Sequence, residues 1–164
     1  YGLVGSEMCI RDRNQVSEGR LSSESKLKIR AMLREVTEIE SIGDSCYNLA
    51  RTINHKYRGN EDFTEKQYSH IHQMFQLTDD ALNQMVSLVE DEGHQVDVNK
   101  SFNLENEINN YRSQLKNQNV LDVNNKEYDY QMGVHYMDLI GECEKLGDYI
   151  VNVVEARTDM KEKK

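Results

Sequence analysis

The sequence contains no proline at any of its 164 positions, although average usage near 5% would supply about eight. Because proline breaks helix interiors, its absence favours long, uninterrupted helices. The sequence also lacks an unbroken apolar run of about 18 residues, the length that indicates a membrane-spanning helix. We therefore expect helices that do not insert into a membrane.

Basic residues and paired cysteines are also scarce. There are 20 Lys and Arg against 29 Asp and Glu, which gives a net charge of −9. A nucleic-acid surface needs clustered Lys and Arg to displace counterions, so we expect no nucleic-acid partner. The three cysteines include no Cys-x-x-Cys pair, which argues against a disulfide framework and a zinc site and indicates a reducing compartment.

The first residues differ from the rest of the chain. Residues 1–13 show no helical apolar spacing, and charges such as Glu7 and Asp12 interrupt the apolar core that a signal peptide needs. The string GSEMCIRDR resembles translated sequencing-adapter sequence. We expect a non-native leader over 1–13, a disordered segment or linker over 14–24, and one helical domain over 25–164.

Apolar residues then recur at alternating steps of three and four, the spacing of a packed helix. The pattern predicts helices over about 22–57, 64–92, 100–118 and 124–160. Thr64 with Gln67 forms a capping box, and Asn124 with Glu127 is expected to cap the last helix. Short connections favour antiparallel neighbours, so the expected fold is an all-α, elongated antiparallel four-helix bundle. The buried seam predicted for the first helix includes Met32, Val36, Ile39, Gly43, Cys46 and Ala50.

An internal repeat links the first helix to the last. Residues 38–48 and 142–152 share the pattern E-x-E-x-[IL]-G-D-x-x-x-N at an offset of 104 residues, with identical residues at five of eleven positions. Residues four apart are displaced by only about 40° around a helix, so each copy makes an oxygen-rich row. The first row is Glu40, Asp44 and Asn48, and the second is Glu144, Asp148 and Asn152.

The two rows are candidates for a ligand site. Neither Glu40 nor Glu144 has a Lys or Arg three or four residues away, which leaves solvent, another helix or a cation as partners. Gly43 and Gly147 each cost about 1 kcal/mol relative to alanine inside a helix, which favours close approach of a backbone or ligand. We expect both rows to turn inward and meet, with Gly43, Gly147, Asn48 and Asn152 at helix contacts. The alternative is that both rows are solvated faces.

The repeated pattern resembles D-L-E-R-I-G-D-x-x-x-N-I, the signature that closes each three-helix repeat of PhoU-like proteins. The run 104–112 resembles the family's D-x-x-[IV]-D helix, and the likeness covers about 25–160. It is strongest to the C-terminal PhoU-like domain of bacterial sodium/phosphate cotransporters. Ser41 and Lys145 replace the signature arginine, and the helices that should precede residue 25 are missing, so we expect an N-terminally truncated domain from a longer protein.

The resemblance implies a divalent metal site of iron, zinc, manganese or magnesium. Carried over by position, its ligands are Glu40, Asp44, Glu105, Asn109, Glu144 and Asp148, with Asn109 in place of a carboxylate. Carboxylate and amide oxygens suit such cations.

The resemblance also implies a regulatory domain in phosphate transport, without enzymatic activity. It would lie at the cytoplasmic face of the bacterial inner membrane, joined to the transporter domain of the same polypeptide, with a homo-oligomer as a further partner. The alternative function is a structural helical interaction bundle with no ligand. The absence of a Glu-x-x-His pair excludes a ferritin-like di-iron bundle. A metal-dependent phosphatase is least favoured, and the sequence has no glycine-rich phosphate loop.

Overall fold

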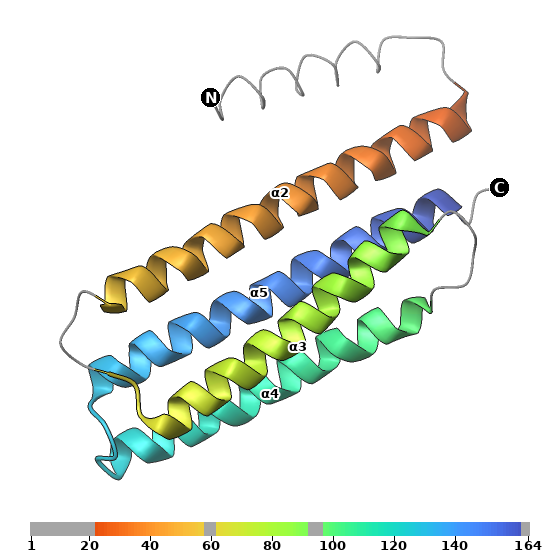
Figure 1. The fold of residues 1–164 in the computed structure, drawn as a ribbon. Helices are drawn as coiled ribbons and strands as arrows, with labels where there is room; N and C mark the ends of the chain where they lie inside the picture. The colour runs from red at the N-terminus through yellow and green to blue at the C-terminus, as the bar shows by residue number, and fades with distance from the viewer. Residues whose placement is uncertain (1–21, 58–61, 92–96, 162–164) are drawn as a thin grey trace.

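The computed structural model describes residues 22–57, 62–91 and 97–161, which form four helices and no strand. These are α2 (Ser23–Tyr57), α3 (Glu65–Glu90), α4 (Val98–Asn124) and α5 (Tyr130–Lys161). Consecutive helices run antiparallel along one long axis, so α3 and α5, which also pack together, are parallel (Figure 1). With a rise of about 1.5 Å per residue, α2 is roughly 50 Å long. The elongated all-α bundle predicted from the sequence is confirmed.

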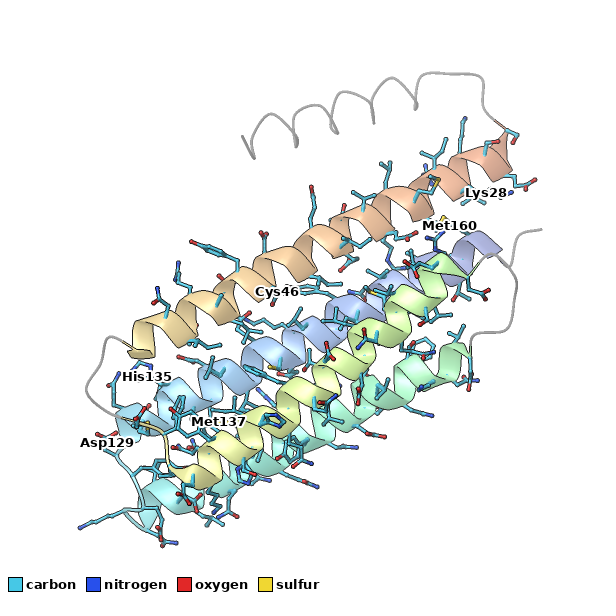
Figure 2. All side chains as sticks on the ribbon, in the orientation of Figure 1. Lys28, Cys46, Asp129, His135, Met137 and Met160 are labelled. Atoms are coloured by element: carbon cyan, nitrogen blue, oxygen red, sulfur yellow. The ribbon has the colours of Figure 1, made fainter. Side chains whose placement is uncertain are left out.

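The last helix, α5, lies at the centre of this arrangement. It packs against each of the other three helices, and α3 and α4 also pack against each other. Among the described residues, α2 packs along α5 and has almost no contact with α3 or α4. Figure 2 shows Lys28 near the start of α2 at the same end of the bundle as Met160 near the end of α5, so these two helices are antiparallel. The molecule is a three-helix unit with a fourth helix on one side.

The apolar core belongs almost entirely to the three-helix unit of α3, α4 and α5. Its most deeply buried hydrophobic side chains are Met74, Ile108, Tyr136, Ile140, Cys143, Leu146, Ile150, Val153 and Val154. From the described part of α2, only Ile42 is a buried hydrophobic residue. Apolar burial is the main stabilising term in folding, so the three-helix unit holds most of it.

The seam predicted for α2 is wrong, because its residues between Met32 and Ala50 are exposed, although Cys46 and Ala50 border a groove toward α3. The exposed residues are Met32, Val36, Ile39, Gly43, Cys46 and Ala50. The helix instead buries Glu35, Ile42 and Ser45. A helix with one neighbour needs to bury only one narrow face, and polar partners on α5 determine which face that is.

Local signals set the helix ends. The capping box is confirmed at the start of α3, where Gln67 N donates to Thr64 Oγ1 at 3.1 Å and Thr64 N donates to Gln67 Oε1 at 3.0 Å. The predicted Asn124 cap is wrong, since Asn124 is the last residue of α4. Asp129 takes the role for α5 by accepting a hydrogen bond from Met132 N at 2.7 Å. Lys126, with φ of 60°, turns the chain between these two helices.

The predicted leader over 1–13 lies outside the described residues, as does most of the predicted linker over 14–24. None of the described helices combines the length and the apolar composition needed to cross a bilayer.

Candidate functional site

The α5 copy of the acidic motif faces α4. Gly147 is buried, and a Cβ atom at this position would lie 3.4 Å from Ile108 Cδ1 of α4. A methyl group here would make ordinary van der Waals contact with Ile108, so the close packing of α4 on α5 needs a small residue at this position. Any side chain much larger than a methyl group would collide with Ile108, and such overpacking is destabilising.

One turn earlier, the same copy forms an ion pair with α4. Glu144 Oε2 lies 3.1 Å from Arg112 Nε, and the two side chains are 27% and 33% exposed. Arg112 Nε has no aligned hydrogen-bond acceptor, so the attraction is between charges rather than through a directed hydrogen bond. Glu144 and Gly147 together fasten α4 to α5 through one charged and one apolar contact.

The two remaining members of the α5 row have different surroundings. Asp148 is exposed and forms no ion pair with any described residue, and partial burial raises the pKa of its carboxyl group. Asn152 Nδ2 donates a hydrogen bond to Glu38 Oε2 of α2 at 3.1 Å. The α5 row thus contacts α4 with one end and α2 with the other.

The acidic row of the α2 copy lies on the outer side of the helix, except that Asn48 borders a polar pocket shared with α5. Glu40, Gly43, Asp44 and Asn48 are all exposed, and a Cβ atom at Gly43 would have no other atom within 4 Å. The expectation that the two rows meet inside the bundle is therefore wrong. Glu38, which faces α5, and Glu40 are about 200° apart around the helix axis, so contact through Glu38 turns the row outward.

Glu38 and Glu142 are the interface residues that sequence reasoning passed over. They occupy the same place in the repeat, and each accepts a hydrogen bond from the opposite helix. Asn152 donates to Glu38, and Ser45 Oγ donates to Glu142 Oε2 at 2.9 Å. α2 and α5 therefore each contact the other helix through the glutamate that opens the repeat. The sequence does mark these two residues, because they are the identical first residues of the two copies of the repeat. They lie on a different side of the helix from the acidic rows.

Charged pairs complete the contact between α2 and α5. Arg34 Nη2 lies 2.7 Å from Glu155 Oε2, and Arg157 Nη2 lies 3.0 Å from Glu35 Oε1. Glu35 is buried, and desolvation raises the pKa of its carboxyl group despite the nearby charge of Arg157. The pair between Arg34 and Glu155 is exposed, and such pairs contribute little to stability and weaken in salt. With few buried apolar residues beside these polar contacts, α2 is held less firmly than the helices that share the apolar core.

On α4, the predicted ligands Glu105 and Asn109 bond to each other rather than to a shared third group. Asn109 Nδ2 donates to Glu105 Oε1, which directs the amide nitrogen, and not its oxygen, toward the carboxylate. Asn109 Oδ1 is buried and has no hydrogen-bond partner among the described atoms. The two oxygens do not converge on one point as cation ligands would.

The predicted ligands do not fit a metal site in this arrangement. Within the described residues, no three His, Cys, Asp or Glu side chains gather closely enough to hold an ion. Glu144 is neutralised by Arg112, and Glu40 and Asp44 face solvent. Multidentate oxygen coordination is what cations such as Mg²⁺ and Ca²⁺ require, and these six residues do not provide it.

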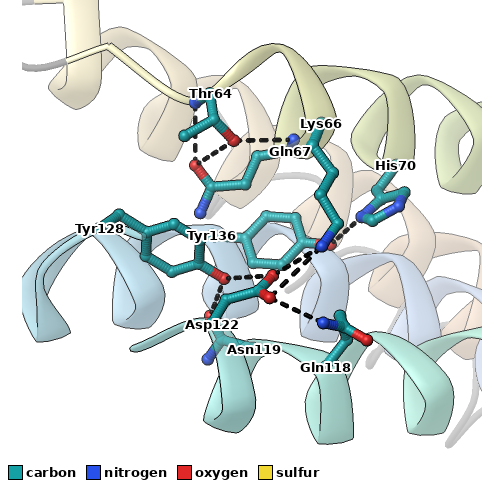
Figure 3. Close-up of polar contacts among 9 residues, drawn as sticks. All are labelled: Thr64, Lys66, Gln67, His70, Gln118, Asn119, Asp122, Tyr128 and Tyr136. Atoms are coloured by element: carbon teal, nitrogen blue, oxygen red, sulfur yellow. Dashed lines mark hydrogen bonds and ion pairs between the residues drawn. The ribbon is translucent and has the colours of Figure 1, made fainter. Parts of the chain in front are cut away.

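A polar cluster at the turn end of the three-helix unit was not predicted (Figure 3). Asp122 of α4 is only 7% exposed, and it accepts hydrogen bonds from Lys66 Nζ at 3.1 Å and Gln118 Nε2 at 2.7 Å. Burial by itself would raise the pKa of Asp122, but these hydrogen bonds outweigh it and lower the pKa. The cluster joins the start of α3 to the end of α4.

The cluster extends to α5 through aromatic hydroxyls. Tyr136 OH lies 3.0 Å from His70 Nδ1, and Tyr128 OH donates to Asn119 Oδ1 at 2.9 Å (Figure 3). Burial, and then the charge of Lys66, lowers the pKa of His70, while burial and Asp122 raise the pKa of Tyr128 to about 12. All three helices are tied together here, which is a structural role.

A polar pocket of about 450 Å³ lies between α2 and α5. It contains Arg51 and Lys145, but also Asp138 and Glu142. Lys145 Nζ is 2.7 Å from Glu142 Oε1, so its charge is already balanced. The pocket has no excess of positive charge and does not favour an anion such as phosphate.

A family model described as the PhoU domain matches residues 71–156, just over half of the chain. The chain belongs to the PhoU domain family. PhoU domains are helical bundles with a general role in regulating phosphate transport. The PhoU match covers all of α4 and most of α3 and α5, so it corresponds to the three-helix unit, and α2 lies before it. No curated protein and no solved structure matched the chain.

Proposed function

We propose that this chain is the PhoU-like regulatory domain of a sodium/phosphate cotransporter, acting without enzymatic activity at the cytoplasmic face of the bacterial inner membrane. Its partner would be the transporter domain of the same polypeptide. One observation carries the proposal: the PhoU three-helix unit is preceded in the chain by a further helix, α2, which repeats the motif of α5. The resemblance of 104–112 to the cotransporter-linked domains supports the finer assignment.

The contact between α2 and α5 is the element through which such regulation would act. Hydrogen bonds and charged pairs hold α2 in place, whereas α3, α4 and α5 share a buried apolar core. A partner that binds one position of α2 better than another would shift the population between them by its difference in affinity. The regulatory signal would then be the position of α2 on a rigid three-helix unit.

Phosphate uptake tests this function. Cells that produce the full-length protein are compared with cells whose protein lacks residues 22–164, at equal amounts of transporter in the membrane. We expect deletion to change the rate of sodium-dependent phosphate uptake or its response to external phosphate. Uptake with unchanged rate and response would contradict a regulatory role.

A structural interaction bundle without a ligand is the second candidate, and the contacts of the α5 motif favour it. Glu144 and Gly147 bind α4 rather than a cation. Replacing Asp44 and Asp148 with Asn separates this reading from a metal-responsive domain. The structural reading predicts stability that stays level or rises slightly because like charges are removed. It also predicts no heat of binding when Mg²⁺, Mn²⁺, Fe²⁺ or Zn²⁺ is titrated, and a saturable heat that is lost in the double variant would contradict it.

A further inference from the structure

The two cysteines in the described part of the chain border the same groove. This groove, of about 570 Å³, is lined by residues of α2, α3 and α5, among them Cys46, Cys143, Leu49 and Phe75. Both cysteines are free thiols, and Cys46 on α2 is exposed whereas Cys143 on α5 is fully buried. An oxidant that enters the groove therefore meets one accessible thiol on α2 and a second, protected thiol on α5.

The packing of α2 along α5 places the two cysteines at nearly the same level. These helices are antiparallel, and Ser45 Oγ of α2 donates a hydrogen bond to Glu142 Oε2 of α5 at 2.9 Å. Cys46 follows Ser45 in the sequence, and Cys143 follows Glu142. At about 1.5 Å of rise per residue, the two cysteines lie within about one helical turn of each other along the bundle axis.

Cys46 also lies beside the face that α2 buries against α5. It comes four residues after Ile42, which is buried, and residues four apart are displaced by only about 40° around a helix. Packed helices have axes about 8–10 Å apart and Cα atoms about 2.3 Å from each axis. Facing Cα atoms are therefore close enough for a disulfide, which spans about 4.4–6.8 Å. A rotation of α2 by about 40° brings Cys46 into such a facing position.

The surroundings of the two thiols decide which one reacts first. Burial raises the pKa of the Cys143 thiol to about 12, and the charge of a Cys46 thiolate contributes to the rise. The contribution of Cys46 means that the two sulfurs are within electrostatic reach of each other. Because the thiolate is the nucleophile in disulfide exchange, the accessible Cys46 reacts with an oxidant before the buried and protonated Cys143 does.

We propose that Cys46 and Cys143 form a redox-modified pair, in which a small disulfide converts the two thiols into a reversible bond between α2 and α5. The Cys46 thiolate attacks one sulfur of the small disulfide, and the first small thiolate leaves. Cys143 then loses its proton to solvent and attacks Cys46 Sγ, and the second small thiolate leaves. The two cysteines are oxidised, and the small disulfide is reduced to two thiols. This chemistry is independent of the proposed role in phosphate transport.

Oxidation of the chain of 164 residues by glutathione disulfide tests the pair. Cys9→Ser removes the third cysteine, and a low protein concentration disfavours bonds between chains. We expect peptide mapping to find Cys46 joined to Cys143, and dithiothreitol to reverse the bond. Because this bond closes a loop of about 100 residues and ties α2 to α5, deuterium exchange of the α2 amides should slow at least about tenfold.

Matched variants separate the pair from general thiol reactivity. In Cys143→Ala, oxidation should stop at a mixed disulfide on Cys46, and α2 should exchange at its original rate. Asp44→Cys combined with Cys46→Ser moves the exposed thiol to the outer side of α2, where it should form the mixed disulfide without joining Cys143. Circular dichroism confirms that each variant is folded.

Three results would overturn the proposal. The first is a mixed disulfide on Cys46 while Cys143 stays reduced in the folded chain. The second is a bond between the Cys46 residues of two chains in place of the bond within one chain. The third is a Cys46–Cys143 bond that forms only when urea unfolds the chain, or that leaves the exchange of α2 unchanged.

Discussion

Gly43 and Gly147 occupy the same position in the two copies of the repeat, yet only Gly147 is covered by another helix. Ile108 lies 3.4 Å from the Cβ position of Gly147, and nothing lies within 4 Å of that of Gly43. The same motif is therefore seen once in contact with a neighbouring helix, on α5, and once without such a contact, on α2. The contrast indicates that the motif joins helices.

Leucine substitutions at the two glycines should have opposite effects. Gly147→Leu forces a side chain into Ile108 and should lower the free energy of unfolding by about 1–3 kcal/mol. Gly43→Leu meets open space and replaces a poor helix former, so it should raise stability by about 0.5–1 kcal/mol. Urea denaturation of both variants provides the comparison. Equal losses at the two positions would mean that Gly43 is covered as Gly147 is.

Stability should depend on pH through His70. Burial lowers its pKa from the ordinary value of 6.5, so below pH 6.5 the unfolded chain binds the proton more readily than the folded chain. The stability that depends on neutral His70 is therefore fully present above about pH 6.5. It is lost as the pH falls below 6.5 and through the lowered pKa of the folded state. His70→Gln should flatten this part of the profile. A variant with the same slope between pH 7 and 5 as the parent would refute the assignment to His70.

Asp122 should matter more than the lysine that binds it. Asp122→Ala leaves the partly buried amide of Gln118 without its acceptor, removes the charge that Lys66 binds and should cost about 1–3 kcal/mol. Lys66→Ala removes an exposed partner and should cost less than about 1 kcal/mol. Thermal unfolding of both variants at pH 7 checks the order. If Lys66→Ala were the more damaging change, the cluster would depend on the exposed charge instead.

The helix α2 should open before the rest of the molecule. Its polar contacts with α5 offer less stabilisation than the shared core, so its amides should exchange with deuterium about tenfold faster than those of α5 or more. Raising the salt concentration to about 1 M should widen the difference, because it screens the charged pairs. Exchange followed by mass spectrometry resolves the two helices, and uniform protection of α2 and α5 would speak against this account.

The sequence predicts the helices well because their signals are local. Apolar spacing and the Thr64–Gln67 capping box depend on residues within one or two turns, and both appear in the structure. The predicted end of α4 is six residues too early because Asn124 is expected to cap the next helix, whereas it is the last residue of α4 and the turn is made at Lys126, which has a positive φ.

The orientation of α2 could not be read from its spacing. Two faces of this helix carry apolar residues, one through Ile42 and one through Val36 and Ile39, and periodicity does not say which has a neighbour. The choice depends on Ser45 and Glu38 meeting Glu142 and Asn152, which lie about a hundred residues away in the chain. The acidic rows were misread for the same reason, since the partner of Glu144 is Arg112 on a different helix.

The most direct test of the motif as a helix-joining device is a charge exchange between α4 and α5. Arg112→Glu and Glu144→Arg each place like charges side by side, and the double variant restores an opposite pair. The account predicts that each single variant lowers the free energy of unfolding by about 1 kcal/mol and that the double variant recovers most of the loss, as interacting pairs do in double-mutant cycles. Losses that simply add in the double variant would contradict it.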